Sequence, residues 1–599
     1  MTVVVLLVLS LGLRLTGLQR FVANDEIRWT CRSIQFREAL RRREWADTLR
    51  VGHPGVVTTW LGAAFIPRNV PEAELICRAS EGGMELDKIG AAPEERTRRI
   101  AMLGQLLFQG RIGVSLFTWL SIFVVYLLVR TVWGPEIGLL SLGLIALDPF
   151  YLALSRVLHI DAVLTSLMTV SVLSLLASLR RPESSVCRSG LLLLSGSVGG
   201  LAMLQKSPAL FVALFAALLL IGDAWRRGRS PQVWSRAGGE LFLWALAAVI
   251  VYVALWPAMW SDPRGTIQRV LDTAVGYAGQ GHEQGNYFLG RPVGDPGWGY
   301  YPVALLFRMS PLVLLGLIAV VFWIARGGEL EERRFDVAAL LVYSILFGVL
   351  MSLGAKKFDR YLLPVFPPIG IAAAVGLLEM AEAGKLVFKR IFNHSLRRWG
   401  HLTITVIVVV LQVALVLPHY PHYLTWYNPL LGGVRQARNA IVVGWGEGYE
   451  QAAAYLNAKS NAEKLRVAVP TFAAFAPLFS GETQPVSDFS TWQTDYVVFY
   501  LAQVQRQHDA SLMERYFSNP RVQPEYTVVL HGVEYAWIYP NTDYLQPLKY
   551  IEKHSRPSQD LLLVNADSVL SRNYHGELEM REFRSHSSPK QVAELLDHL

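Results

Sequence analysis

Two adjacent carboxylates, Asp25 and Glu26, follow the first long apolar run of the chain and open a polar stretch. A carboxylate in such a place has the chemistry of a general base toward an incoming hydroxyl, or of a ligand for a divalent cation. The structural alternative is that the pair only caps a helix in a loop. The other ionisable residues of the chain therefore bear on which interpretation holds.

Asp161 is a second candidate, because it stands at the start of an otherwise apolar segment, in the run Ser155-Arg156-Val157-Leu158-His159-Ile160-Asp161. A charged side chain placed near lipid is costly, so such a residue is a functional candidate by default. An ion pair with Arg156 is the structural alternative, although a spacing of five residues does not favour it within one helix. Arg156 and His159 are counted here as candidate substrate-binding residues.

Basic residues form a third set of candidates. Lys206 stands alone at a short break between two apolar runs, and Lys356, Lys357 and Arg360 directly precede the run that begins with Tyr361. Cations near the level of the lipid headgroups suit a lipid-linked phosphate. Ordinary contact with headgroups is the alternative. We include Tyr361 with these cations as a candidate for substrate binding.

Two polar loops add further candidates. His53 begins a His-Pro-Gly turn in the first loop, while His282 and Glu283 lie in a later loop, ahead of the aromatic run Trp298-Gly299-Tyr300-Tyr301. Polar and aromatic side chains together can line a sugar site, although interfacial belts of Trp and Tyr give a similar composition. A divalent metal ion is left open, and its possible ligands are Asp25, Glu26, His53 and Asp161.

The elements that must position these residues are membrane helices. The chain of 599 residues is 52% hydrophobic and 17% charged, which is too apolar for an ordinary soluble protein. A bilayer span takes roughly 17 to 25 apolar residues. Eleven such runs lie near residues 2–19, 109–129, 136–154, 158–179, 189–205, 207–223, 239–257, 301–325, 336–354, 361–381 and 402–418. We therefore expect a mainly α, polytopic membrane protein, with the first run retained because it lacks the marks of a signal peptide.

The short loops set the orientation, because Lys and Arg are held on the cytoplasmic side. With residue 1 inside, the cytoplasmic loops contain Arg130, Arg180, Arg181, Arg188, Arg226, Arg227, Arg229, Arg236, Arg326, Arg333, Arg334, Lys385, Lys389, Arg390, Arg397 and Arg398. The opposite short loops hold only Arg156, Lys206 and the group at 356–360. This pattern places residues 20–108, 258–300 and 419–599 outside a cell membrane.

The net charge and the cysteines say less about function than the candidate residues described above. The formal charge of +8 is spread over cytoplasmic loops without an aromatic-interleaved basic domain, which argues against a nucleic-acid partner. Cys31 and Cys77 would share the first outer loop and could form a disulfide in an oxidising compartment, with unpaired thiols as the default interpretation. Cys187 would be cytoplasmic and free.

Beyond the last apolar run the composition changes to that of a soluble domain. The periodicity of hydrophobic residues and the local composition predict helices at 452–458 and 502–517. They predict strands at 465–469, 496–500, 526–530 and 535–539. We expect an α/β or α+β domain at 421–545, outside the membrane, after a membrane domain at 1–420. Residues 546–599 form a polar tail that either belongs to this domain or stands apart.

The order of these motifs resembles the GT-C superfamily of integral membrane glycosyltransferases, in the branch of protein O-mannosyltransferases and lipid A aminoarabinose transferases. The resemblance covers residues 1–420. It rests on Asp25-Glu26 with Arg28-Trp29, on His53-Pro54, on Ser155-Arg156 leading to Asp161, on Lys206-Ser207-Pro208, and on the run from Lys357 to Pro364. The chain departs from the family's His-Pro-Pro at Gly55 and from its Lys-Gly-Pro at Ser207.

The resemblance implies a polyprenyl-phosphate-linked sugar as donor, transfer to an acceptor hydroxyl on the outer face, and inversion at the anomeric carbon. It makes Asp25 the catalytic base, gives Glu26 and Asp161 the role of orienting the acceptor or a metal, and places His53 in the same cavity. Arg28 joins the substrate-binding candidates through the same motif. The cations that would stabilise the departing phosphate are Lys206, Lys357 and Arg360. The acceptor, whether protein, lipid or glycan, stays open.

Two other classes of function compete with an enzyme. A transporter or flippase of a lipid-linked saccharide also needs outer cations and a polar cavity, and a non-catalytic scaffold would bind through its outer domain. Transporters often show internal repeats and intramembrane charges on both faces. The candidates of this chain gather on one face, and the sequence shows no internal repeat. The enzyme is therefore the favoured interpretation.

Overall fold

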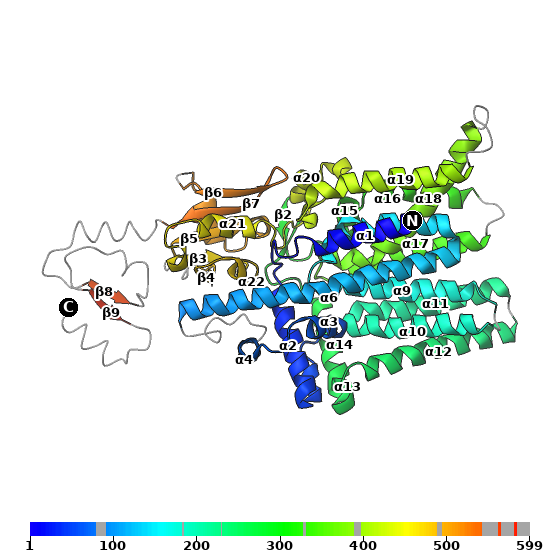
Figure 1. Cartoon of the computed structure of the whole chain (residues 1–599), viewed down its shortest axis with the longest axis horizontal. Helices are drawn as coiled ribbons and strands as arrows, with labels where there is room; N and C mark the ends of the chain where they lie inside the picture. The colour runs from blue at the N-terminus through cyan, green and yellow to red at the C-terminus, as the bar shows by residue number, and fades with distance from the viewer. Residues whose placement is uncertain are drawn as a thin grey trace.

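The computed structural model describes residues 1–79, 92–182, 185–228, 230–326, 331–388, 397–487, 494–520 and 522–541, and the strands at 561–564 and 580–583. A bundle of long helices forms one end of the molecule, and a small mixed sheet with short helices stands against its other end (Figure 1). The mainly α architecture with a C-terminal sheet domain is confirmed. Apart from its two short strands, the predicted tail at 546–599 lies outside the described residues.

Eight helices of the described residues are long and apolar enough to cross a membrane. They are α6 (Pro93–Trp133), α9 (Ile160–Leu179), α10 (Val186–Gln205), η2 with α11 (Ser207–Ala209 and Leu210–Arg227), α12 (Pro231–Ala254), α17 (Glu331–Leu353), η3 with α18 (Asp359–Val365 and Phe366–Phe388) and α19 (Arg397–Val416). A ninth span arises if α15 (Tyr300–Arg308) and α16 (Pro311–Ala325), bent by 114°, are taken together.

The remaining predicted spans fall on shorter apolar helices. These are α1 (Thr2–Leu15) and α7 (Pro135–Ala146), the latter followed by α8 (Pro149–Leu154). Each of the eleven apolar runs thus coincides with helical structure, while the number of crossings stays a prediction. Several of these helices begin with proline at the first helical position, where its missing N–H costs no hydrogen bond.

Short helices cover the end of the bundle that faces the sheet domain. The first polar loop forms α2 (Glu26–Arg42), η1 (Trp45–Thr48), α3 (Val56–Phe65) and α4 (Pro71–Ala79). The second forms α13 (Ala258–Ser261), α14 (Pro263–Gly279) and an antiparallel hairpin of β1 (Asn286–Phe288) and β2 (Arg291–Val293). In the view of Figure 1, α2 and α14 both cross the end of the bundle. The candidate residues therefore lie under a cap of loop helices.

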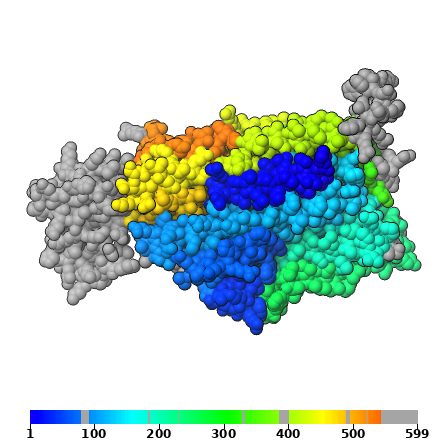
Figure 2. Space-filling model, viewed as in Figure 1, coloured from blue at the N-terminus to red at the C-terminus, as the bar shows by residue number. Residues whose placement is uncertain are grey.

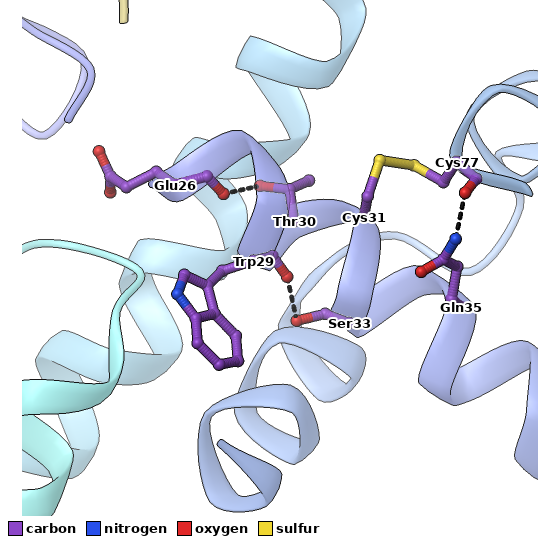
Figure 3. Close-up of a disulfide and its surroundings, with 7 residues drawn as sticks. All are labelled: Glu26, Trp29, Thr30, Cys31, Ser33, Gln35 and Cys77. Atoms are coloured by element: carbon purple, nitrogen blue, oxygen red, sulfur yellow. Dashed lines mark hydrogen bonds between the residues drawn. A yellow bond between two sulfur atoms is a disulfide. The ribbon is translucent and has the colours of Figure 1, made fainter. Parts of the chain in front are cut away.

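A disulfide joins Cys31 of α2 to Cys77 of α4, which corrects the default expectation of unpaired thiols (Figure 3). The link is reinforced by Gln35, whose side-chain amide donates to the carbonyl of Cys77. Both sulfur-bearing residues are fully buried, so packing holds them side by side. Cys187 is free and exposed, as the sequence predicts.

The C-terminal domain is built on a five-stranded mixed sheet with strand order β4-β3-β5-β7-β6. The strands are β3 (Arg466–Val469), β4 (Glu482–Pro485), β5 (Tyr496–Tyr500), β6 (Tyr526–Leu530) and β7 (Val533–Pro540). Strand β3 runs parallel to β4 and β5, whereas β7 is antiparallel to β5 and β6. All four predicted strands are present, and β4 is an addition.

Short helices connect these strands. They are α20 (Gly433–Ala440), α21 (Tyr449–Asn457), α22 (Phe472–Phe475), α24 (Leu501–Arg506) and α25 (Ala510–Leu512). The helix predicted at 502–517 is interrupted, because Gln507 at the C-cap of α24 and Asp509 at the N-cap of α25 adopt positive φ angles of 51° and 61°. A π-helical turn, η10 (Met513–Phe517), follows α25. Further along, β8 (Leu561–Val564) and β9 (Met580–Phe583) pair in parallel.

The sheet domain is tied to the bundle at several points. Helix α6 has 41 residues and continues beyond the bundle, where Arg96 forms an ion pair of 2.7 Å with Glu482 of β4. In the space-filling view α6 reaches from the bundle to below the yellow sheet domain (Figure 2). On another side, Phe288 of β1 pairs with Ile441 after α20. These contacts fix the domain against the capped end of the bundle.

Candidate active site

Asp25 occupies the N-cap position of α2, yet its side chain makes no capping hydrogen bond. Its carboxylate lies 3.7 Å from Nη2 of Arg360, 3.9 Å from Nε2 of His159 and 3.9 Å from Nη1 of Arg28. About a quarter of the side chain is exposed, at 27%. Asp25 is therefore a partly accessible carboxylate with positively charged neighbours at loose ionic distance, rather than a structural cap.

Glu26 has the opposite environment. It is fully buried, and its oxygens accept hydrogen bonds from the Arg111 guanidinium at 2.7 Å and from the backbone N–H groups of Ala23 and Leu158 at 2.7 and 2.8 Å. Arg111 itself is buried in α6 and also donates to the carbonyl of Phe21. Because these donors occupy both oxygens, the geometry gives Glu26 the role of holding α2 against α6 and does not support the catalytic role expected from the sequence.

Asp161 lies at the first turn of α9 and is buried among three side chains that can carry positive charge. Its Oδ1 is 2.8 Å from Nζ of Lys206, and its Oδ2 is 3.3 Å from Nδ1 of His159 and 3.5 Å from Nε of Arg360. The ammonium of Lys206 also lies 3.9 Å from the ring centre of Tyr361. Three of the predicted residues thus converge on Asp161, from the N-cap of α9, the α10–η2 break and η3, and Tyr361 contacts the Lys206 of this group.

Three atoms of this group remain without a hydrogen bond inside the protein. Asp161 Oδ2, His159 Nδ1 and Arg360 Nε are buried and have no hydrogen-bond partner among the described residues. Asp161 Oδ2 nevertheless lies 3.3 Å from His159 Nδ1 and 3.5 Å from Arg360 Nε, so the three atoms face one another at ionic distance.

Aromatic rings enclose the same cluster. His159 meets the rings of Trp29 and Trp445 edge-on, with centroids 6.1 and 5.1 Å away. The guanidinium of Arg360 lies 4.6 Å from the Trp445 ring. Trp445 belongs to the segment after α20, and the sequence analysis missed it. The sequence signal for Trp445 was weak, because a single Trp in the glycine-rich turn Val443-Gly444-Trp445-Gly446 does not predict a contact with His159.

His53 and Lys356 lie at the edge of the site, around one tyrosine. Nδ1 of His53 is 3.4 Å from the Tyr277 hydroxyl, and the His53 ring meets Trp29 edge-on at 5.8 Å. The ammonium of Lys356 lies 4.2 Å from the Tyr277 ring centre. Burial lowers the pKa of His53 to about 3 and also lowers the pKa of Lys356. His53 is consequently neutral at pH 7.

Other candidates lie away from the acidic cluster. Arg156 donates to the Thr16 carbonyl and packs 4.9 Å from the ring centre of Tyr423, which are structural contacts. Lys357 is buried in an ion pair of 2.7 Å with Asp295 of the second polar loop. The structure therefore does not bring Arg156 and Lys357 together with Asp161, and their binding of substrate stays a prediction.

The remaining two candidates come from the second polar loop. His282 meets the ring of Phe358 edge-on at 5.2 Å, and burial lowers its pKa to about 4. Glu283 is exposed. His282 thus borders the segment that carries Arg360, and the charge of Glu283 acts on Lys356 of the same segment.

A metal site is not assembled from the possible ligands named above. The described residues contain no group of three His, Cys, Asp or Glu side chains able to hold a metal ion. Of the four possible ligands, Glu26 is bound by Arg111 and Asp161 by Lys206. Positive side chains lie against these carboxylates, Arg111 against Glu26 and Lys206 and Arg360 against Asp161.

Sequence comparisons link the chain to known transferases. The family model of dolichyl-phosphate-mannose-protein mannosyltransferases matches residues 98–255. The chain is also 26% identical over 318 residues to undecaprenyl phosphate-alpha-4-amino-4-deoxy-L-arabinose arabinosyl transferase 1 of Pseudomonas fluorescens (strain Pf0-1), covering 49% of each chain. The chain thus matches about half the length of this curated relative.

Solved structures show weaker similarity. ArnT from Cupriavidus metallidurans, bound to undecaprenyl phosphate, is 15% identical with a TM-score of 0.44, covering 90% of this chain and 96% of that chain. The oligosaccharyltransferase AglB from Archaeoglobus fulgidus is 11% identical with a TM-score of 0.43, covering 89% and 73%. Both TM-scores are below 0.5. The two sequence matches confirm the resemblance to GT-C membrane glycosyltransferases.

Proposed function

We propose that this protein is a membrane glycosyltransferase that moves a sugar from a polyprenyl-phosphate-linked donor to an acceptor hydroxyl on the outer face of the membrane. One observation carries the proposal. Of the three carboxylates predicted to do chemistry, Asp25 is the one that is partly exposed and free of a tight ion pair, and it borders Arg360 and the Lys206–Asp161 pair. The similarity in sequence to two lipid-phosphate-dependent transferases supports this class of reaction.

The proposed reaction is a single displacement with inversion. The acceptor oxygen attacks the anomeric carbon and forms a new C–O bond, while the bond from that carbon to the phosphate oxygen breaks and its electron pair stays on the phosphate. Asp25 takes the proton of the acceptor hydroxyl. Arg360 and Lys206 stabilise the charge gained by the leaving phosphate. A phosphate leaves readily, so the site needs a base and cations more than it needs a strong acid.

The charge state of Asp25 fits this role. Burial alone would raise the pKa of Asp25, but the neighbouring His159, Arg360 and Arg28 outweigh burial and hold the pKa below its usual value. The carboxylate is therefore ionised at neutral pH. Such a weak base takes the proton late, when the new bond to carbon has already made the hydroxyl acidic.

The disulfide supports the outer placement of the site. Disulfides persist in oxidising compartments and are rare in the cytosol. Cys31 lies on α2, the helix that begins at Asp25, so the compartment that oxidises Cys31 and Cys77 is the one that the base faces. This agrees with the orientation that the positive loops predict.

A transfer assay tests the proposal. Purified protein is mixed with a synthetic polyprenyl-phosphate sugar and with candidate hydroxyl acceptors, and the anomeric configuration of the product is read by NMR. Formation of an inverted glycoside together with polyprenyl phosphate is the expected result. Movement of the intact donor across vesicle membranes without any transfer would instead favour the flippase.

A further inference from the structure

One turn of the sheet domain, residues 443–448, lies against the segment that leads to Asp25. The backbone N–H of Asn24, the residue before Asp25, donates to the carbonyl of Trp445 at 3.3 Å. The Trp445 ring packs on a small buried apolar cluster made of Phe21, Ala23 and Val157. The backbone next to the proposed base is therefore bonded directly to the sheet domain.

The same ring touches two side chains of the acidic cluster. It meets the His159 ring edge-on at 5.1 Å between centroids, and the guanidinium of Arg360 lies 4.6 Å from its centre. His159 and Arg360 are the neighbours of the Asp25 carboxylate, at 3.9 and 3.7 Å. These ionic distances are loose, so the charges alone do not fix the three groups, and the packing of Trp445 adds the missing constraint.

Gly446 lets the turn approach this closely. Its φ angle is 131°, which a residue with a side chain rarely adopts. A Cβ at this position would lie 2.1 Å from the carbonyl oxygen of Val22. Because that oxygen belongs to the backbone, it cannot rotate away as a side chain would. The turn and the segment before Asp25 are thus in backbone-to-backbone contact.

The shape of the turn is set from the sheet side by two buried residues, Tyr500 of β5 and Glu447. The N–H of Gly446 donates to the Tyr500 hydroxyl at 2.9 Å, and the N–H of Trp445 donates to the Glu447 carboxylate at 2.7 Å. The Tyr500 hydroxyl in turn donates to the carbonyl of Glu447 at 3.1 Å. The position of Trp445 is therefore determined by the sheet, and not only by the bundle that it contacts.

We propose that Trp445 is a positioning residue of the active site, through which the sheet domain sets the relative placement of Asp25, His159 and Arg360. This inference rests on the proposed function and gives the sheet domain a part in the chemical step. The three side chains come from the start of α2, the N-cap of α9 and η3, and the turn contacts all three segments. A general base works only within hydrogen-bond reach of its hydroxyl, and a misplacement of about 1 Å can cost about a hundredfold in rate.

A pair of glycine variants tests the role of the turn without removing any side chain. Gly446→Ala places a methyl group against the Val22 carbonyl and pushes the turn away from Asp25. Gly532→Ala is the matched control, because Gly532 also has a positive φ angle, 74°, but its Cβ would meet only the end of the Arg435 side chain. We expect Gly446→Ala to lower the single-turnover rate by about tenfold to a hundredfold. The KM for the lipid-linked donor should stay within about threefold, and Gly532→Ala should react like the unmodified protein.

A second pair of variants tests the ring itself. Trp445→Ala removes the packing on His159 and Arg360, whereas Trp445→Phe keeps an aromatic ring and should restore most of the rate. The positive groups that lower the pKa of Asp25 are His159, Arg360, Arg28 and Arg32. If two of them are no longer held in place, the pKa of Asp25 rises, and the acidic limb of the pH–activity profile moves to higher pH in Trp445→Ala. A loss of stability alone leaves that limb where it was.

The outcomes separate a positioning role from a structural one. Equal rates for the unmodified protein, Gly446→Ala and Trp445→Ala overturn the proposal. A slower Trp445→Ala protein with an unmoved acidic limb, or an equally slow Gly532→Ala protein, overturns it as well and leaves the turn a structural role. If Trp445→Ala does not fold, Tyr500→Phe removes the hydroxyl that holds Gly446 and should lower the rate several-fold, and an unchanged rate is equally adverse.

Failure of the proposed function gives a different result. An unmodified protein that transfers no sugar to any acceptor refutes the transferase before the variants are compared. An unmodified protein that transfers sugar no faster than Gly446→Ala and Trp445→Ala refutes the role of Trp445 alone.

Discussion

Lys206 and Asp161 contact each other at 2.8 Å although 45 residues of sequence separate them. Lys206 stands in the break between α10 and η2, and Asp161 stands in the first turn of α9. Asp161 also lies 3.5 Å from Arg360. The pair therefore joins three elements of the bundle, and it places two cations beside the carboxylate of Asp25.

Removal of one partner of this pair should destabilise the protein. Lys206→Met leaves the buried carboxylate of Asp161 with weaker partners, and an uncompensated buried charge of this kind costs about 3 to 5 kcal/mol. The double variant Lys206→Met/Asp161→Asn should recover much of that stability and remain poor in sugar transfer. Thermal unfolding and transfer assays on the three proteins measure both effects. Wild-type turnover by the double variant would show that the pair is structural only.

Asp25→Asn should reduce the rate of transfer by about a hundred- to ten-thousandfold, the usual contribution of a general base. The fold should persist, because Asp25 makes no capping bond and no tight ion pair. Single-turnover rates and melting temperatures check this. Asp47→Asn, on the exposed surface of the same loop, is the matched control and should keep full activity. A rate for Asp25→Asn equal to that of the control excludes Asp25 as the base.

Glu26→Gln should behave in the opposite way from Asp25→Asn. The change removes a buried charge that pairs with Arg111, so the free energy of unfolding should fall by about 3 to 5 kcal/mol. The rate per folded molecule should change much less than in Asp25→Asn, since Glu26 has no oxygen free for substrate. Stability and the active fraction are measured together, and a stable but inactive Glu26→Gln protein would contradict this division of roles.

The contrast between Asp25 and Glu26 shows what the sequence could predict. Adjacency and position after an apolar run identified both as candidates, but the pairing of Glu26 with Arg111 spans 85 residues and has no local signature. An arginine inside the predicted span at 109–129 was the available signal, since a buried charge needs a partner. Trp445 was missed for a related reason, because it reaches the site only through the docking of the sheet domain.

The fold was predictable where the pattern is local. Apolar runs located the helices of the bundle, and strands such as Tyr496–Tyr500 combine β-branched and aromatic residues. Strand β4, with the sequence Glu-Thr-Gln-Pro, lacks such a pattern and forms through its parallel pairing with β3. The sharp bend between α15 and α16 likewise depends on the Ser310-Pro311 step, where Ser310 caps the second helix.

The pH dependence of transfer should reflect the lowered pKa of Asp25. Activity requires the ionised carboxylate, so activity is lost only as pH falls through that lowered pKa, below the ordinary value of about 3.9. Arg28→Gln removes a positive neighbour, which raises the pKa of Asp25 and moves the acidic limb to higher pH. The acidic limb of the pH–activity profile should shift by less than about one pH unit, because Arg28 is 48% exposed and solvent screens its charge. A limb that moves to lower pH in Arg28→Gln would contradict the assignment.

The three cysteines offer a test of sidedness. An impermeant thiol reagent added to intact cells should leave Cys31 and Cys77 unlabelled while they are bonded. Because both positions are buried, labelling them should need unfolding as well as a reductant, and Cys31 of a Cys77→Ser protein should need unfolding alone. Cys187, exposed and free, should react only after the membrane is opened. Cys77→Ser should also lower stability by about 2 to 4 kcal/mol. Labelling of Cys187 from outside intact cells would invert the orientation and would place Asp25, which begins the helix that carries Cys31, on the cytoplasmic face.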